Sequence, residues 1–307
     1  MLNFAQSTRP AEQWSTLDLL GSIGRALRLH QWAKNALLFV PLLLAHALSA
    51  SNLRRTALAF FSFSLCASAT YIVNDLVDLD ADRRHPRKRY RPFAAGDLSA
   101  TAGRWMAAAS LIVALLIAWS LSSVFLGWLL CYLAVTVAYS LALKRIELID
   151  VFVLAGLYTL RLLAGGAVTV TAISPWLLGF SLFLFLSLAM VKRFSELQNL
   201  RASGQVPNNG RGYHLVDIES LRSFGTASGY ASVVIFALYI SGRDVTALYR
   251  HPHRMWLMAP FLLLWISRFW LLASRGEMDE DPIFFALTDS TSILIGACLI
   301  LIGLLAV

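Results

Sequence analysis

Long runs of apolar residues, separated by short polar segments, extend along almost the whole chain. A helix that crosses the hydrocarbon core of a bilayer needs about 20 mainly apolar residues, with a range of roughly 17 to 25. This measure predicts an all-α, polytopic membrane protein with about nine transmembrane helices, near residues 36–50, 56–73, 105–121, 123–142, 149–172, 175–191, 225–241, 255–272 and 291–307. The first run is short and contains Pro41, so its boundaries are the hardest to assign.

The polar segments between these runs are brief. The two longest cover residues 74–104 and 192–224, which leaves no room for a separate soluble domain. Residues 1–34 carry several charges and no long apolar core, so we expect no signal peptide. We predict a leader over 1–24, partly disordered or interfacial, followed by a single transmembrane domain over 25–307.

Composition supports the membrane interpretation. Of the 307 residues, 58% are hydrophobic and only 14% are charged, whereas ordinary soluble domains carry about 25% charge. These values exclude a secreted disulfide scaffold, a disordered chain and a conventional cytosolic enzyme. The net charge of +8 is explained more simply by cytoplasmic loops that face anionic lipid than by nucleic-acid binding.

The distribution of charge predicts the orientation. With a cytoplasmic N-terminus, that side receives 19 of the 26 Lys and Arg residues and the opposite side receives 5, while Arg161 and Arg268 lie inside spans. The positive-inside rule therefore places the N-terminus in the cytoplasm of a bacterial-type inner membrane. All acidic residues except Asp244 lie on that same side or at its helix ends, as expected of an ionic active site.

Acidic residues gather where the second span ends. At 100° per residue, Asn74, Asp75, Asp78 and Asp82 fall within one helical arc of about 100°. Carboxylates at this spacing repel one another, so a cation should compensate them. Mg²⁺ is the natural candidate, because it takes oxygen ligands from one or two carboxylates together with substrate phosphates. The alternative is a solvated helix end with an accidental acidic stripe.

A basic run broken by Pro86 and Pro92 follows directly, and we interpret it as a loop. Its cations could bind a phosphate beside the metal, with Lys88 and Arg91 as the best individual candidates. Juxtamembrane basic residues also serve topology alone, and this alternative stays open.

A second ionic cluster joins the fourth and fifth spans. It contains Tyr139, Lys144, Arg145, Glu147 and Asp150. If one helix continues through it, Glu147, Asp150 and the intramembrane Arg161 share an arc of about 60°. Arg161 should face the bundle interior and meet a carboxylate of another span or a bound anion, because eleven residues of helix separate it from Asp150 by about 16 Å. Gly165 and Gly166 nearby predict close helix packing.

A third cluster ends the sixth span. Lys192 and Glu196 lie one turn apart, with Arg193 beside them. The cluster is either a phosphate clamp or a salt-bridged helix end. In the last cytoplasmic loop we interpret Glu277, Asp279, Glu280 and Asp281 as mostly solvated, with a weaker case for a functional Asp281 or Asp289.

These residues give the chain a resemblance to a known family. The run Asn74-Asp75-x-x-Asp78-x-x-x-Asp82 after an apolar span resembles the UbiA superfamily of intramembrane prenyltransferases, and the likeness covers nearly the whole chain after about residue 24. Four stretches are most similar to the branch typified by decaprenyl-phosphate phosphoribosyltransferase: HQWAKN at 30–35, HPRKRYRPFAAG at 85–96, YSLALKR at 139–145 and KRFSEL at 192–197.

The resemblance implies a UbiA-like helical barrel open to lipid, with a Mg²⁺-bound diphosphate substrate at its cytoplasmic end. Aromatic prenyltransferases of the superfamily typically carry a second aspartate-rich motif after the sixth span, whereas this chain has Lys192, Arg193 and Glu196 there. This departure favours two phosphorylated substrates. A second departure is Ser290, which stands where close relatives would carry an arginine.

We therefore expect Mg²⁺-dependent transfer of a 5-phosphoribosyl group from phosphoribosyl diphosphate to a polyprenyl phosphate, with release of diphosphate. The expected catalytic residues and metal ligands are Asp75, Asp78 and Asp82. The expected substrate-binding residues are Lys34, Asn74, Lys88, Arg91, Tyr139, Lys144, Arg145, Arg161, Lys192, Arg193 and Glu196. Two alternatives stay open: transfer of a prenyl group from polyprenyl diphosphate to an aromatic or other small acceptor, and a non-enzymatic lipid transporter.

Overall fold

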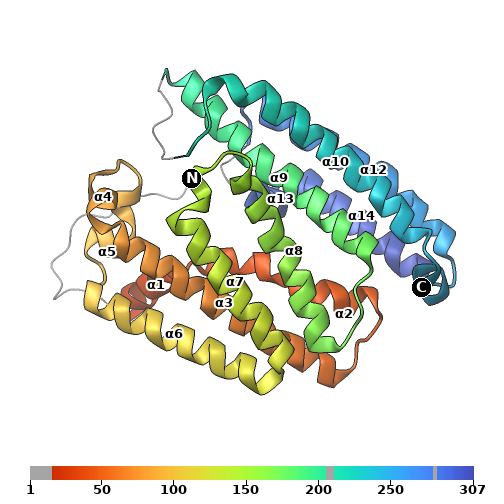
Figure 1. Cartoon of the computed structure of the whole chain (residues 1–307), viewed down its shortest axis with the longest axis horizontal. Coiled ribbons are helices and arrows are strands. Elements are labelled where there is room, and N and C mark those ends of the chain that lie inside the picture. The colour runs from red at the N-terminus through yellow and green to blue at the C-terminus, as the bar shows by residue number, and fades with distance from the viewer. Residues whose placement is uncertain (1–15, 205–210, 279–281) are drawn as a thin grey trace. The chain divides into compact units, whose positions relative to one another are not determined.

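A computed structural model of the chain describes residues 16–204, 211–278 and 282–307. Over these residues the fold is all-α, with α-helices and short 3₁₀ turns and no strand, as the sequence predicts (Figure 1). The chain divides into two compact units. The first comprises the described part of Met1–Ala36 together with Leu53–Leu133, and the second comprises Leu37–Asn52 and Ala134–Val307.

The first unit is built around α3 (Ala50–Val77). The other elements of this unit are α1 (Thr16–Ala26), most of η2 (Leu29–Phe39), α4 (Leu79–Arg84), η3 (Lys88–Tyr90), α5 (Pro92–Ala95), α6 (Ala100–Leu121) and the first half of α7 (Ser123–Leu141). Ile72 of α3 packs against Ala26, Phe93 and Ala107 in a small core. Farther along α3, Phe63 packs against Phe125 and Tyr132 of α7.

Polar contacts hold the segment Leu27–Asn35 along one face of α3. The Ser64 hydroxyl accepts a hydrogen bond from the Asn35 amide at 3.0 Å. One turn on, the Ser68 hydroxyl accepts from the Trp32 indole at 3.0 Å and donates to the Leu27 carbonyl at 2.6 Å. Positions 64 and 68 differ by one turn of helix, so they share the face that continues toward the acidic end of α3.

The second unit contains α2 (Val40–Leu44), the end of α7, η4 (Leu143–Arg145), α8 (Ile149–Thr169), α9 (Pro175–Ala202), η5 (Leu215–Asp217), α10 (Ile218–Ile240), α11 (Arg243–Leu248), η6 (Pro252–Leu257), α12 (Met258–Ser274), α13 (Pro282–Thr288) and α14 (Ser290–Ala306). Helices α9, α10 and α12 run side by side (Figure 1). Gly225 of α10 permits this approach, because a Cβ there would lie 2.2 Å from the Trp270 ring of α12. The Ser187 hydroxyl of α9 accepts from the Trp270 indole at 3.0 Å and donates to the Gly225 carbonyl at 2.7 Å.

Seven helices of the described chain are long and apolar enough to cross a membrane, and the count is eight if α13 and α14, bent by 78°, form one broken span. The sequence predicted about nine. The number of spans differs because residues 36–50 do not form a long helix. They form the end of η2 and the five-residue α2, with Pro41 at the start of α2. The expected span over 291–307 is α14.

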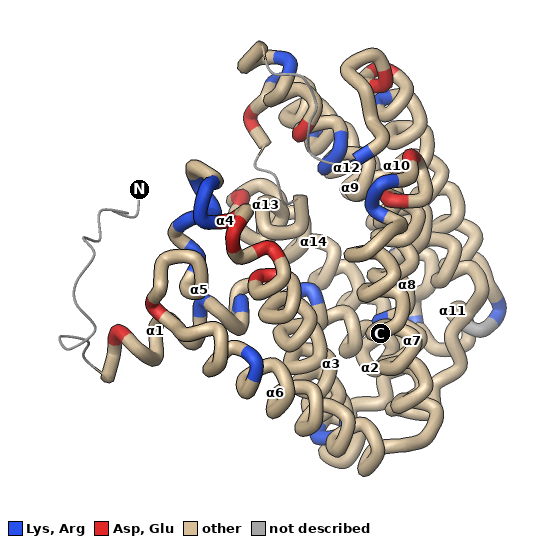
Figure 2. The backbone as a smooth tube through the Cα atoms, turned by 60° about the vertical axis from the view of Figure 1, so that its left-hand side comes forward, with Lys and Arg blue, Asp and Glu red and all other residues tan. Residues whose placement is uncertain are grey.

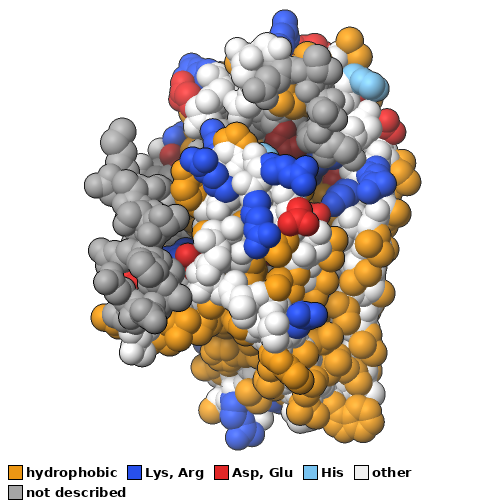
Figure 3. All heavy atoms as spheres, turned by 90° about the vertical axis from the view of Figure 1, so that its left-hand side faces the viewer, with side chains coloured by type: hydrophobic (Ala, Val, Ile, Leu, Met, Phe, Trp, Pro, Cys, Tyr) orange, Lys and Arg blue, Asp and Glu red, His pale blue; other side chains and the backbone are white. Residues whose placement is uncertain are grey.

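Exposed apolar side chains cover the outer faces of several spans. On α6, Trp105, Ile112, Leu116 and Trp119 are exposed at helical spacing. Figure 3 shows hydrophobic side chains over much of the surface in view. Large exposed apolar faces are unfavourable in water and favourable against the hydrocarbon of a bilayer, so the structure is that of an integral membrane protein.

Gly165 lies at a close contact of α8 with another element, whereas Gly166 contacts the segment that follows its own helix. A Cβ on Gly165 would lie 2.3 Å from the carbonyl oxygen of Leu38, so α8 contacts that main chain directly. A Cβ on Gly166 would meet the Ile173 side chain, which folds back over the end of α8.

Candidate active site

In the first unit, two buried aspartates share one arginine. Asp75 lies near the end of α3 and Asp82 lies in α4. Nη1 of Arg91, the residue before α5, donates to Asp75 Oδ1 at 2.9 Å and to Asp82 Oδ2 at 2.7 Å. Figure 2 shows the acidic residues of this region beside a run of basic ones at α4 and α5.

The helical register explains why these aspartates meet. Asp78 lies between the end of α3 and the start of α4. Its N–H nevertheless donates to the Asn74 carbonyl at 2.9 Å, and its carbonyl accepts from Asp82 N–H at 2.8 Å, as in a continuous helix. The helical periodicity therefore continues across the junction, and Asp75 and Asp82, two turns apart, face the same way. The Asp78 side chain is exposed and Asn74 is half-buried.

A second arginine also binds Asp75. Arg28 Nη2 donates to Asp75 Oδ1 at 2.6 Å, and its guanidinium lies 4.7 Å from the centre of the Tyr71 ring. Arg28 has a left-handed backbone with φ of 52° and lies in the segment Leu27–Asn35 that is held along α3. The sequence analysis missed this residue. The only signal for it was the general need of buried carboxylates for a compensating cation, which does not say which cation.

Asp75 and Asp82 supply carboxylate oxygens, the kind of ligand that Mg²⁺ takes. Over residues 16–204, 211–278 and 282–307 no group of three or more His, Cys, Asp or Glu side chains is arranged to hold a metal ion. Asp75 and Asp82 nevertheless each place a carboxylate oxygen within 3 Å of the same cationic nitrogen of Arg91. Two buried carboxylates around one positive centre form a donor set that suits Mg²⁺, which also takes substrate phosphates and water as ligands.

Two other candidates of the first unit differ in burial. Lys88 is exposed on η3. The loop before it is shaped by His85, whose Nδ1 accepts from the main-chain N–H groups of Arg87 and Lys88 at 3.2 and 3.3 Å. Lys34 is half-buried on η2, within the segment that lies along α3.

In the second unit, a buried arginine joins three helices. Arg193 of α9 is 2% exposed, and its Nε lies 2.5 Å from Oδ2 of Asp150, which begins α8 and is fully buried. Its Nη1 donates to Glu196 one turn on, and its Nη2 donates to the Tyr139 hydroxyl of α7 at 3.4 Å. Tyr139 in turn donates to Asp150 Oδ1 at 2.6 Å.

Two residues that the sequence analysis missed complete this network. Arg211 Nη1 donates to Glu196 Oε2 at 3.1 Å. The Tyr213 hydroxyl accepts from Leu148 N–H at 3.0 Å and so fixes the turn before α8. Burial raises the pKa of Tyr213 to about 12, so its hydroxyl stays protonated at neutral pH. No local spacing pointed to these residues, because they follow α9 in a loop and reach back to its end.

The remaining candidates around this network differ in burial. Lys144 and Lys192 are half-buried, whereas Arg145 and Glu147 are exposed. Glu147 does not share a helical arc with Asp150, because Leu148 has a φ of 60° and α8 begins only at Ile149. Glu147 instead lies against Gly212, where a Cβ would come 2.1 Å from its Oε1.

Arg161 is buried in the middle of α8, as expected of an intramembrane arginine. It is 6% exposed, and its Nη1 donates to the Leu157 carbonyl at 2.5 Å. Its guanidinium lies 5.4 Å from the centre of the Tyr158 ring. A main-chain carbonyl and the face of an aromatic ring thus stabilise the charge of Arg161. The two partners that the sequence left open, a carboxylate of another span and a bound anion, stay predictions.

The other intramembrane arginine has a carboxylate partner. Arg268 of α12 binds Asp289 through two hydrogen bonds of 2.6 and 3.0 Å. Asp289 also caps α14 by accepting from Ser292 N–H at 2.8 Å, so the pair fixes the bend between α13 and α14. Asp281, the other weak candidate of this loop, lies outside the described residues.

Comparison with known proteins gives a consistent set of similarities. Residues 36–292 match the profile of the UbiA prenyltransferase family. Uncharacterized protein y4nM of Sinorhizobium fredii is 41% identical over 88% of this chain, which spans about half (53%) of that relative's length. Nodulation protein NoeC of Azorhizobium caulinodans is 34% identical over 92% of each chain. Decaprenyl-phosphate phosphoribosyltransferase of Mycobacterium tuberculosis is 32% identical over 74% of this chain and 76% of its own.

A solved structure agrees on the fold. A UbiA homolog from Archaeoglobus fulgidus, bound to GPP and Mg²⁺, superimposes with a TM-score of 0.67, covering 92% of this chain and 99% of that one. The two sequences are 16% identical, so this likeness concerns the fold.

Proposed function

Because this chain belongs to the UbiA prenyltransferase family, a family of transferases, we propose that it transfers a 5-phosphoribosyl group from phosphoribosyl diphosphate to a polyprenyl phosphate. The relatives named decaprenyl-phosphate phosphoribosyltransferase support the choice of donor and acceptor. The observation that carries the proposal is the ion pairing between the second ionic cluster, at Asp150, and the third, at Arg193 and Glu196.

Both carboxylates at the end of α9 and the start of α8 are bound by guanidinium groups. Asp150 contacts Arg193, and Glu196 contacts Arg193 and Arg211. A second metal-binding motif would need carboxylate oxygens that are available for a cation. Both oxygens of Asp150 are bound, one by Arg193 and one by Tyr139, whereas the arginine contacts of Asp75 and Asp82 engage one oxygen of each carboxylate. The cationic residues Lys144 and Lys192 lie nearby in sequence and suit an acceptor phosphate or the 5-phosphate of the donor.

The diphosphate of the donor would bind at Asp75 and Asp82. A divalent cation held there would neutralise the charge that develops on the departing diphosphate. Arg28 and Arg91 are the groups of this chain that can contribute the same kind of stabilisation, because each places guanidinium N–H groups at the aspartates. Asp78 is the third candidate ligand of this motif, and its exposed side chain is free of the arginine contacts that bind Asp75 and Asp82.

The reaction breaks the bond between C1 of the ribose and the diphosphate oxygen, and it forms a bond from C1 to the phosphate oxygen of the acceptor. The electron pair of the broken bond leaves with diphosphate. A phosphate acceptor is already ionised at neutral pH, so the reaction needs no strong general base. This chemistry agrees with a site of carboxylates and permanent cations.

The exposed apolar faces of the spans suit a lipid acceptor. The polyprenyl tail would remain in the bilayer while its phosphate reaches the charged ends of the helices. We place this end at the cytoplasmic side of a bacterial-type inner membrane, because the Lys and Arg residues are concentrated there.

The test uses the purified full-length protein with Mg²⁺, decaprenyl phosphate and phosphoribosyl diphosphate labelled in the ribose. The proposal predicts a labelled lipid, and no product when labelled decaprenyl diphosphate and 4-hydroxybenzoate replace this pair. Product from the prenyl donor alone would overturn the proposal in favour of prenyl transfer. Asp80→Asn is the matched control for Asp75→Asn and Asp82→Asn. Asp80 is exposed, and among the described residues its ion-pair partner is Arg83, at 3.4 Å.

A further inference from the structure

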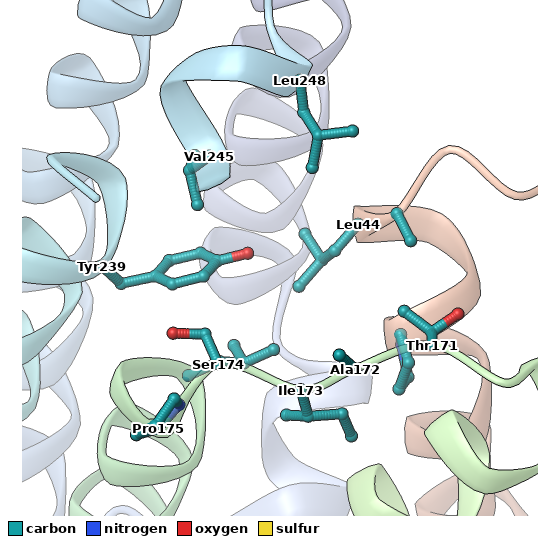
Figure 4. A pocket seen from close by; sticks show the side chains of 12 residues that line it. Leu44, Thr171, Ala172, Ile173, Ser174, Pro175, Tyr239, Val245 and Leu248 are labelled. Atoms are coloured by element: carbon teal, nitrogen blue, oxygen red, sulfur yellow. The ribbon is translucent and has the colours of Figure 1, made fainter. Parts of the chain in front are cut away.

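A pocket of about 260 Å³ opens in the second unit, at the end of α8 that is remote from Asp150 (Figure 4). It is walled by α2, the extended segment between α8 and α9, the end of α10 and α11. Because α8 rises about 1.5 Å per residue over its 21 residues, the pocket lies roughly 30 Å from the Arg193 network. The proposed transfer chemistry therefore leaves this pocket unused.

The described residues that line the pocket carry no charge. Its lining consists of apolar residues with Tyr239, Thr171 and Ser174 as the polar members, and none of the twelve lining residues is ionisable at neutral pH. Burying a phosphate or carboxylate here would leave that charge without a partner, at a large free-energy cost. The head group of a polyprenyl phosphate is therefore excluded as the occupant.

The pocket nevertheless contains one buried hydrogen-bond donor, the Tyr239 hydroxyl, that has no partner among the described residues. Tyr239 is 7% exposed, points its hydroxyl toward Leu44 (Figure 4), and forms no hydrogen bond with any residue of the described chain. Thr171 N–H donates to the Gly166 carbonyl at 2.9 Å, and the neighbouring Ala172 and Ile173 are exposed and half-buried, respectively. A buried side-chain hydroxyl without a partner is uncommon in proteins, so we expect the occupant to supply an oxygen acceptor to Tyr239.

Exposed apolar side chains flank part of the pocket. Residues next to the lining in sequence include Leu43 and Val170, which are 54% and 88% exposed, and the lining residue Leu248 is itself 47% exposed. In a membrane protein such side chains face hydrocarbon. The occupant thus enters from an apolar phase and brings a neutral oxygen with it.

We propose that this pocket binds one chain of a membrane glycerolipid, with an ester oxygen that accepts the hydrogen bond of the Tyr239 hydroxyl. The hydrocarbon next to the ester would lie against Leu44, Ile173 and Val245. A polyprenyl tail carries no oxygen along its length, so it would leave Tyr239 unpaired. The volume is smaller than the roughly 300–1,000 Å³ of typical ligand sites, which suits the upper part of a single chain and not a whole lipid.

The experiment uses the full-length protein in vesicles that contain a phosphatidylglycerol with a diazirine next to the ester of one chain. After photolysis, peptide mass spectrometry locates the labelled residues. We expect label on residues 171–175 and on Tyr239, reduced several-fold by Tyr239→Phe and by Ile173→Trp, which fills the pocket. Tyr230→Phe is the matched control, because Tyr230 lies on the same helix, is 42% exposed and already bonds Ser267 at 3.1 Å.

Three outcomes would overturn the proposal. Label spread evenly over the exposed helix faces would show that no specific site exists. Unchanged label in Tyr239→Phe and Ile173→Trp, with melting temperatures equal to the wild type, would place the lipid elsewhere. Loss of the label on addition of unlabelled decaprenyl phosphate, but not of unlabelled phosphatidylglycerol, would identify the occupant as an isoprenoid. The transferase assay plays no part in this readout, so the two proposals fail independently.

Discussion

Arg28 donates a 2.6 Å hydrogen bond to the buried carboxylate of Asp75, which lies 47 positions further along the chain. This contact ties the segment before the first membrane-spanning helix to the acidic end of that helix. Asp75 is 4% exposed and its arginine partner 24%, so water screens the pair only in part. The position of the candidate metal ligand therefore depends on a residue outside the aspartate motif.

Replacing Arg28 with methionine should destabilise the protein and lower its activity. The change keeps the apolar stem over Tyr71 but removes one of two guanidinium groups from a buried carboxylate, a loss of about 1.5–3 kcal/mol in the free energy of unfolding. Arg25→Met is the matched control, because its pair with Asp97 is exposed and contributes about 0–1 kcal/mol. Thermal unfolding in detergent measures both, and equal melting temperatures for the two variants would refute the role of Arg28.

Replacing Arg193 with methionine should be more damaging. Asp150, which is fully buried, would lose its cationic partner, at a cost of about 3–5 kcal/mol in the free energy of unfolding. The double variant Arg193→Met/Asp150→Leu should recover part of this loss, because no buried carboxylate is then left uncompensated. Arg222→Met serves as control, since Arg222 pairs with Glu219 on an exposed helix face. A double variant no more stable than Arg193→Met would argue against a coupled pair.

Two glycine substitutions should have opposite signs. Gly225→Ala would place a Cβ 2.2 Å from the Trp270 ring and force α10 away from α12, with an expected loss of about 1–3 kcal/mol in the free energy of unfolding. Gly127→Ala meets no atom within 4 Å and lies inside α7, so it should stabilise the helix by up to about 1 kcal/mol. Melting temperatures that move in the same direction for both variants would contradict the close packing of α9, α10 and α12.

Much of the fold follows from the sequence, because membrane-spanning helices need long apolar runs and short connections. The expectation fails at residues 36–50, where Pro41 and a 3₁₀ segment replace a regular span, and hydropathy alone does not detect such breaks. The apolar run that ends the chain is α14, joined to α13 at a bend set by Arg268 and Asp289, a contact between residues 21 positions apart.

The candidate site is predictable only where its residues share one helix. Asp75 and Asp82 meet because they are two helical turns apart, a relationship that the spacing gives directly. The contacts of Arg28 with Asp75 and of Arg193 with Asp150 join separate segments, and no local pattern encodes which segments meet. Glu147 illustrates the reverse case, because a single left-handed residue, Leu148, removes it from the helical arc in which spacing placed it.

The central claim is that Asp75 and Asp82 hold the metal-bound diphosphate of the donor. The most direct measurement is the rate of ribosyl transfer from labelled phosphoribosyl diphosphate to decaprenyl phosphate as a function of Mg²⁺ concentration, for the wild type, Asp75→Asn, Asp82→Asn and the exposed control Asp80→Asn. We predict rates at least about 100-fold lower for Asp75→Asn and Asp82→Asn and near the wild type for Asp80→Asn. Wild-type rates and Mg²⁺ dependence in Asp75→Asn and Asp82→Asn would contradict it.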